Sequence, residues 1–199
     1  MVASVFTLSA LSFGTLGSVS VFLKPLVLEF GWTRAEASLG YTVISFSSAI
    51  FGILWGQLAD RYGSRYFGFM ASVAMSACLI LLSEQSSLIQ FYSLYFVFGA
   101  LGNAMLGAPL YANVGYWFKK NPGLALGITA AGGAFGQGVV PMGAALLIEN
   151  YGWQSAYLIL GVSYFLIGFP LAFLVKEPPA RQNSEAQQMT TDNDFPLGE

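Results

Sequence analysis

The chain has 199 residues, of which 55% are hydrophobic and 9% are charged, and its net charge is −2. Soluble domains average about 25% charged residues, so this composition leaves too little polar surface for a soluble globule. The sequence has no His, one Cys and no basic block, which excludes a disulfide, a zinc site and a Cys–His nucleophile pair within this chain. We therefore expect no metal ion, no cofactor, no catalytic residue, no enzymatic activity and no nucleic-acid partner.

Long runs without a charged side chain follow one another along the chain. A helix needs about 20 apolar residues to cross the roughly 30 Å hydrocarbon core of a bilayer. We predict an all-α membrane protein with a six-transmembrane-helix bundle over residues 1–175. The approximate spans are 2–23, 37–58, 66–83, 88–117, 123–148 and 154–175. The first run lacks the basic start of a secretory signal, so we interpret it as a span.

Lys and Arg are divided unevenly between the two sides of this predicted bundle. One side carries Arg61, Arg65, Lys119, Lys120, Lys176 and Arg181, and the other carries only Lys24 and Arg34. The positive-inside rule then puts both termini in the cytoplasm, in a plasma membrane or a bacterial inner membrane. Residues 176–199 are polar and begin near two prolines, so we expect a flexible cytoplasmic tail or linker.

Two tryptophans fall near span ends on the outer side, Trp32 and Trp153. Amphipathic aromatic rings are enriched at the level of the lipid headgroups. We interpret both tryptophans as anchors in an interfacial aromatic belt.

One face of the second span carries polar and small side chains. These residues recur at helical spacing and are Tyr41, Ser45, Ser48, Gly52 and Trp55. Small and hydroxyl residues let membrane helices pack closely, and the same residues can line a wet cavity. The sequence leaves both interpretations open.

The fourth span carries Asn103, Asn113 and Tyr111 within a long apolar run. An amide in a membrane helix needs a hydrogen-bond partner, because lipid offers none. Asn103 and Asn113 therefore face a cavity or bond to another helix, and the sequence does not decide between these roles.

The fifth span is rich in glycine and contains Pro141. Glycine permits close backbone contact and weakens a helix, and Pro141 removes a backbone donor. In a transporter, such an interrupted segment indicates the moving or binding region. We expect Gly132, Gly136 and Pro141 to give this helix flexibility, and the amide of Gln137 to need a polar partner.

The predicted spans contain no ionisable residue at mid-depth. Ionisable residues inside a membrane mark ion and proton pathways. Their absence from these spans argues against a complete ion-coupled carrier within this chain alone.

The segment GQLADRYGSRY, residues 56–66, resembles the loop between helices two and three of the major facilitator superfamily. The pattern G-x-x-x-D-R-x-G-x-R is matched by Gly56, Asp60, Arg61, Gly63 and Arg65. Residues 30–38, 116–132 and 151–161 are similar to further motifs of the monocarboxylate-transporter and oxalate/formate-antiporter branch. In the second of these segments the basic motif is formed by Lys119, Lys120, Leu124, Ala125 and Gly127.

The chain also departs from the pattern of that branch. The position of an Arg that is frequent in helix four is Tyr95, and the position of a Lys in helix one is Gly17. Val140, Ala144 and Ala145 replace glycines of a helix-five antiporter motif. The charged partner for a substrate in those relatives is therefore not carried over to this chain.

The resemblance implies half of a major facilitator fold, because the family has twelve helices in two six-helix halves. It implies transport of a small solute, a mono- or dicarboxylate, by alternating access, with H+ as a possible coupling ion. The implied partners are the lipid bilayer and a second six-helix half. The loop residues 56–65 would gate the cytoplasmic side.

From the residues, we expect the solute cavity to be lined by Tyr41, Ser45, Ser48, Asn103, Tyr111 and Gln137. Two alternatives stay open at this point. The chain could pair with a second copy of itself as a homodimerising half-transporter, or it could be a membrane scaffold that transports nothing.

Overall fold

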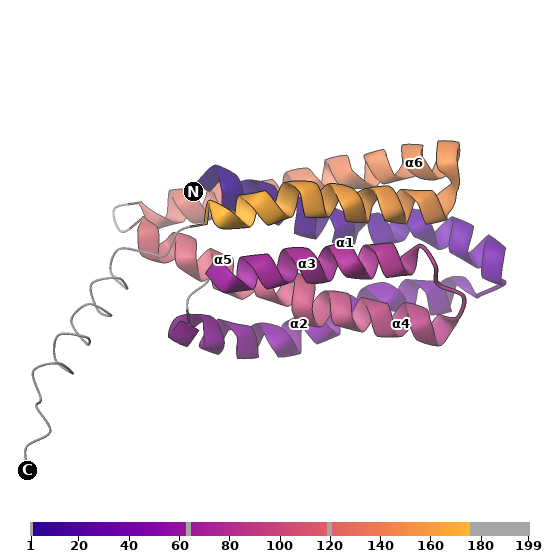
Figure 1. Cartoon of the computed structure of the whole chain (residues 1–199), viewed down its shortest axis with the longest axis horizontal. Helices are drawn as coiled ribbons and strands as arrows, with labels where there is room; N and C mark the ends of the chain where they lie inside the picture. Colours follow the sequence, from indigo (N-terminus) through magenta and orange to yellow (C-terminus); the bar gives the residue numbers. More distant parts are fainter. Residues whose placement is uncertain (1, 63–64, 119–120, 176–199) are drawn as a thin grey trace, which may run out of the picture.

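The computed structural model describes residues 2–62, 65–118 and 121–175, and within these residues the chain folds into helices without a strand. The helices lie alongside one another along the long axis of the molecule (Figure 1). The predicted all-α class is confirmed. The proposed tail, residues 176–199, lies outside the described residues.

Seven helical segments make up the described chain. They are α1 Val2–Phe30, α2 Arg34–Tyr62, α3 Arg65–Leu82, α4 Leu88–Val97, the π-helix η1 Phe98–Asn103, α5 Ala104–Trp117 and α6 Pro122–Phe173. The segments α4, η1 and α5 follow one another without a break and form one rod. Gly152, with φ of 82°, interrupts α6, whose two arms 122–151 and 153–173 fold back on each other (Figure 1).

Local chemistry sets the junction between α1 and α2. Gly31 takes a φ of 68°, and its N–H donates to the carbonyl of Val27 at 3.1 Å, which ends α1 in a left-handed cap. Thr33 and Glu36 then form a capping box at the start of α2. The Thr33 N–H donates to Glu36 Oε2 at 2.8 Å, and the Glu36 N–H donates to Thr33 Oγ1 at 3.2 Å.

Four described helices have the length and hydropathy to cross a membrane, namely Val2–Phe30, Arg34–Ala59, Leu88–Gly115 and Pro122–Phe173. Tyr66–Leu82 is a shorter apolar helix. Because Gly152 divides α6, each of its arms is about as long as a bilayer requires. The division of the chain into six spans remains a prediction.

Glycines bring α1 and the first arm of α6 into backbone contact. A Cβ on Gly136 would overlap the carbonyl oxygen of Ala10, and a Cβ on Gly132 would lie 2.5 Å from the carbonyl oxygen of Phe6. From the other side, a Cβ on Gly14 would overlap the side chain of Val140. We call this contact between α1 and the first arm the glycine seam. It fixes the position of α1, which carries part of the candidate site.

Candidate functional site

The site is built on the π-helical turn η1, which ends at Asn103. A π-turn holds one residue more than an α-turn, so the side chains after it are rotated by about 100° around the helix axis. Gly99 lets this wide turn rest on α2, since a Cβ there would overlap Ser47 and the carbonyl of Ile44. Trp55 Nε1 of α2 donates to the carbonyl of Ala100 at 2.6 Å. The turn is therefore fixed against α2 by both shape and a hydrogen bond.

Asn103 joins three segments of the bundle through its side chain. Ser12 Oγ of α1 donates to Asn103 Oδ1 at 2.7 Å, and Asn103 Nδ2 donates to Ser48 Oγ of α2 at 3.0 Å. Each of these residues lies near the middle of its helical rod, at a depth where transporters bind their solutes. We call Ser12, Asn103 and Ser48 the amide triad.

A hollow of about 580 Å³ opens beside the amide triad. Its lining residues are uncharged and come from α1, α2, η1 and α5, namely Phe13, Ser45, Ser48, Ala49, Gly52, Ile53, Asn103, Ala104 and Gly107. Binding sites for organic molecules usually combine an apolar wall with a few polar groups, at volumes of roughly 300–1,000 Å³. This hollow has that composition.

Three of the six predicted cavity residues meet in this hollow, Ser45, Ser48 and Asn103. Tyr111 does not line it, and its hydroxyl lies 3.1 Å from the Ser9 hydroxyl of α1. Tyr41, which is 49% exposed, and Gln137 also lie outside the lining. The assignment of a solute cavity to these residues remains a prediction.

The polar face of α2 serves both roles that the sequence left open. Ser45, Ser48 and Gly52 line the hollow, whereas Trp55 packs against η1 and donates a hydrogen bond to it. Sequence reasoning missed Ser9 and Ser12, which bond to α5 and to η1. A sequence pattern could have revealed them, because hydroxyl residues recur at helical spacing along α1, where the structure buries them.

The structure describes only part of the two family motifs at the helix ends. Gly56 is half-buried, Arg61 and Leu124 are exposed, Ala125 is buried, and a Cβ on Gly127 would meet no described atom within 4 Å. Gly63, Lys119 and Lys120, and the side chains of Asp60 and Arg65, lie outside the described residues. The gating roles of these motifs remain predictions.

Two of the fifth-span glycines named above have a packing role in the structure. Gly132 and Gly136 belong to the glycine seam, and Pro141 lies against α1, where a Cβ on Gly17 would be 3.3 Å from its ring. The helix flexibility expected of Gly132, Gly136 and Pro141 remains a prediction.

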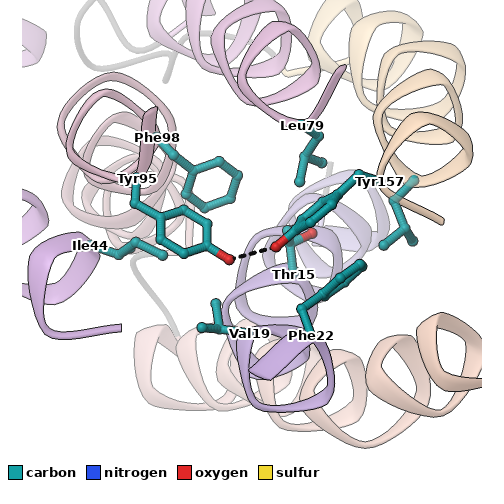
Figure 2. A pocket seen from close by; sticks show the side chains of 9 residues that line it. Thr15, Val19, Phe22, Ile44, Leu79, Tyr95, Phe98 and Tyr157 are labelled. Atoms are coloured by element: carbon teal, nitrogen blue, oxygen red, sulfur yellow. Dashed lines mark hydrogen bonds between the residues drawn. The ribbon is translucent and has the colours of Figure 1, made fainter. Parts of the chain in front are cut away.

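A second polar pair lies deep in the bundle. Tyr95 of α4 and Tyr157 of the second α6 arm are 3% and 2% exposed, and their hydroxyls are 2.8 Å apart (Figure 2). Phe22 stacks on the Tyr157 ring at a centroid distance of 3.8 Å. The adjoining cavity, which Thr15 also lines, has about 10 Å³ and so admits about one water molecule. This closed pocket is too small for an organic solute.

The aromatic-belt interpretation is wrong for Trp153. Its side chain is only 6% exposed and packs edge-on against Phe30, with ring centroids 5.7 Å apart. Trp32 is partly buried and stacks on the same Phe30 ring at 4.7 Å. Both indoles therefore pack with other aromatic rings at this end of the bundle.

These features define an all-α membrane bundle with an uncharged, mostly apolar hollow at mid-depth, into which a few polar side chains project. The family model of the Major Facilitator Superfamily matches residues 5–197. The chain therefore belongs to this superfamily, as the sequence motifs predicted.

Relatives of this chain include transporters that are named after different solutes. The riboflavin transporter RibJ of Trypanosoma brucei brucei is 28% identical over 90% of this chain and 34% of its own length. Monocarboxylate transporter 4 of Gallus gallus is 30% identical over 78% of this chain and 33% of its own. Monocarboxylate transporter 12-B of Danio rerio is 27% identical over 98% of this chain and 40% of its own. The predicted resemblance to monocarboxylate transporters is confirmed, and the chain spans only 34%, 33% and 40% of these three relatives.

Proposed function

We propose that this chain is the N-terminal six-helix half of a secondary transporter that moves a small organic solute by alternating access. The observation that carries the proposal is the hollow beside the amide triad, at the middle of α1, α2 and the α4–η1–α5 rod. In the proposed mechanism, two six-helix halves rock around a solute held between them near the bilayer midplane.

The proposed solute class is an organic mono- or dicarboxylate, and H+ is the proposed coupling ion. Relatives named monocarboxylate transporters support the carboxylate class. The relative named a riboflavin transporter supports a larger heterocyclic solute as the second candidate.

The proposed partner covers the hollow from the open side. Ile53 lines the hollow and is 67% exposed, which supports a protein surface packed against it in the working transporter. A second six-helix half is the first proposal, and a second copy of this chain is the alternative. A scaffold without transport activity is the remaining alternative, and an uptake measurement separates it from both.

The proposed topology places both termini in the cytoplasm of a plasma or bacterial inner membrane. The loop with Asp60, Arg61 and Arg65 then lies on the cytoplasmic side, where we propose that it latches the transporter closed through charge pairing. The excess of Lys and Arg on that side supports this orientation.

Uptake of labelled lactate and labelled riboflavin into cells that express the gene product containing this chain tests the proposal. We expect uptake of one solute above that of cells with empty vector. The variant Asp60→Asn should lower the maximal rate while the half-saturating concentration changes less, because a gate affects the conformational step. Absence of uptake for both solutes would contradict the proposed solute classes, and an unchanged rate in Asp60→Asn would contradict the latch.

A further inference from the structure

The Asn103 amide keeps unused hydrogen-bonding capacity at the hollow. An amide has two N–H donors and an oxygen with two lone pairs. Ser12 occupies one lone pair, and Ser48 accepts from one N–H. In the described part of the chain the Asn103 side chain makes these two bonds, so one donor and one acceptor remain. The same count of one unused donor and one unused acceptor results if the oxygen and nitrogen of the Asn103 amide exchange places, because both serine hydroxyls can donate and accept.

The amide is held in one place before a solute arrives. The Ser12 and Ser48 bonds fix it from two sides, and the Trp55–Ala100 bond fixes the π-turn that carries it. A pre-organised group binds at a lower entropy cost than a mobile one. Asn103 is thus suited to distinguish solutes by hydrogen-bond geometry.

The lining residues of the hollow determine which chemical groups of a solute the Asn103 amide can bind. None of the lining residues is charged, so they supply no cation for a carboxylate. A carboxylate can only accept, and it would leave the remaining lone pair of the Asn103 oxygen facing negative oxygens. A hydroxyl or an amide both donates and accepts, and it would satisfy the remaining donor and acceptor of Asn103.

We propose that Asn103 is the specificity-determining residue of this half, and that it selects solutes carrying an uncharged group that both donates and accepts a hydrogen bond. On a hydroxy acid this group is the hydroxyl, and on a flavin it is the imide of the ring. Any carboxylate of the solute is held by groups outside this hollow. This inference rests on the proposed transport function and names the part of the solute that this half contacts.

Matched solute pairs test the inference in cells that express the full gene product. Lactate is paired with propionate, which lacks the hydroxyl, and riboflavin is paired with 3-methylriboflavin, whose imide cannot donate. Each unlabelled analogue competes against whichever labelled parent solute the cells take up. We expect the parent to compete about tenfold better than its analogue, the size of one well-placed hydrogen bond.

The variant Asn103→Leu keeps a side chain of similar size and removes the amide. It should lose the discrimination between parent and analogue, because the group that distinguishes the two solutes is gone. Ser48→Ala, which leaves Asn103 in place but frees one N–H, should alter the discrimination less. Ser76→Ala is the matched control, since it removes a hydrogen bond of 2.8 Å to the Gly161 carbonyl, between α3 and α6 and away from the hollow. This control should keep the full discrimination.

The outcomes separate the inference from the proposed function. Uptake with equal discrimination in wild type and Asn103→Leu would overturn the role of Asn103 and leave the transport function standing. If the wild-type protein takes up a parent solute but does not distinguish it from its analogue, the role of Asn103 is likewise overturned and the transport function stands. Uptake of neither parent solute would overturn both. If Asn103→Leu does not reach the membrane, an unchanged discrimination in Ser48→Ala would count against the inference and a reduced one would support it.

Discussion

Glycines of the same helix meet two different environments in the first arm of α6. At Gly136 the backbone of α1 occupies the space that a Cβ would need, whereas a Cβ on Gly138 would meet nothing within 4 Å. The two residues are two positions apart and belong to opposite faces of the arm. Glycine content alone therefore does not reveal a role. The face of the arm that packs against α1 requires glycine because the interior of the bundle is closed there. The opposite face is open and tolerates a larger residue.

The largest expected effect is at the glycine seam. Gly136→Ala should destabilise the folded chain by about 1–3 kcal/mol or prevent folding, because neither backbone can move away. Unfolding can be followed in detergent with a thiol-reactive dye, since Cys78 is the only cysteine and is 3% exposed. Gly138→Ala is the matched control and should stabilise by up to about 1 kcal/mol through helix propensity. Equal effects at both positions would contradict the contrast between the two faces.

A second expected effect tests whether polar groups in the closed interior depend on each other. Tyr157→Phe should cost about 1–3 kcal/mol, because it leaves the Tyr95 hydroxyl buried without its partner. The double variant with Tyr95→Phe should cost less than the sum of the single variants. The same dye measurement on all three variants gives the coupling energy. Strictly additive costs would show that the two hydroxyls do not stabilise each other.

The smallest expected effect lies at the border between the interior and the hollow. Trp55→Phe should cost about 1 kcal/mol, because it removes the hydrogen bond to Ala100 and keeps an aromatic ring. If the bond positions Asn103, the same variant should also weaken the lactate–propionate or riboflavin–methylriboflavin discrimination. A loss of stability with unchanged discrimination would assign Trp55 to packing alone.

Much of the candidate site was accessible to sequence reasoning. Asn103 stood out because an amide in an apolar helix needs a partner, and Ser45 and Ser48 lay on one helical face of α2. Tyr41 lies on that face as well, yet it is exposed and outside the hollow. Helical spacing indicates which residues share a face, but only the neighbouring helices determine where along that face a hollow forms.

Other features had no sequence signal. Phe98–Asn103 forms a π-turn, although FGALGN contains nothing that distinguishes it from an ordinary helical stretch. Tyr95 and Tyr157 are 62 positions apart and meet only because α4 and the second arm of α6 pack together. Trp153 was expected among the lipid headgroups, and packing with Phe30 buries it instead.

The sequence by itself determined the all-α membrane class and the superfamily. These properties depend on local features, namely the length of apolar runs and the short motifs at their ends. Only the tertiary structure decided which glycines form the seam, which serines hold Asn103 and which polar groups are sealed inside. The physical reason is that each of these roles is a contact between helices, and a contact depends on the crossing and rotation of both partners.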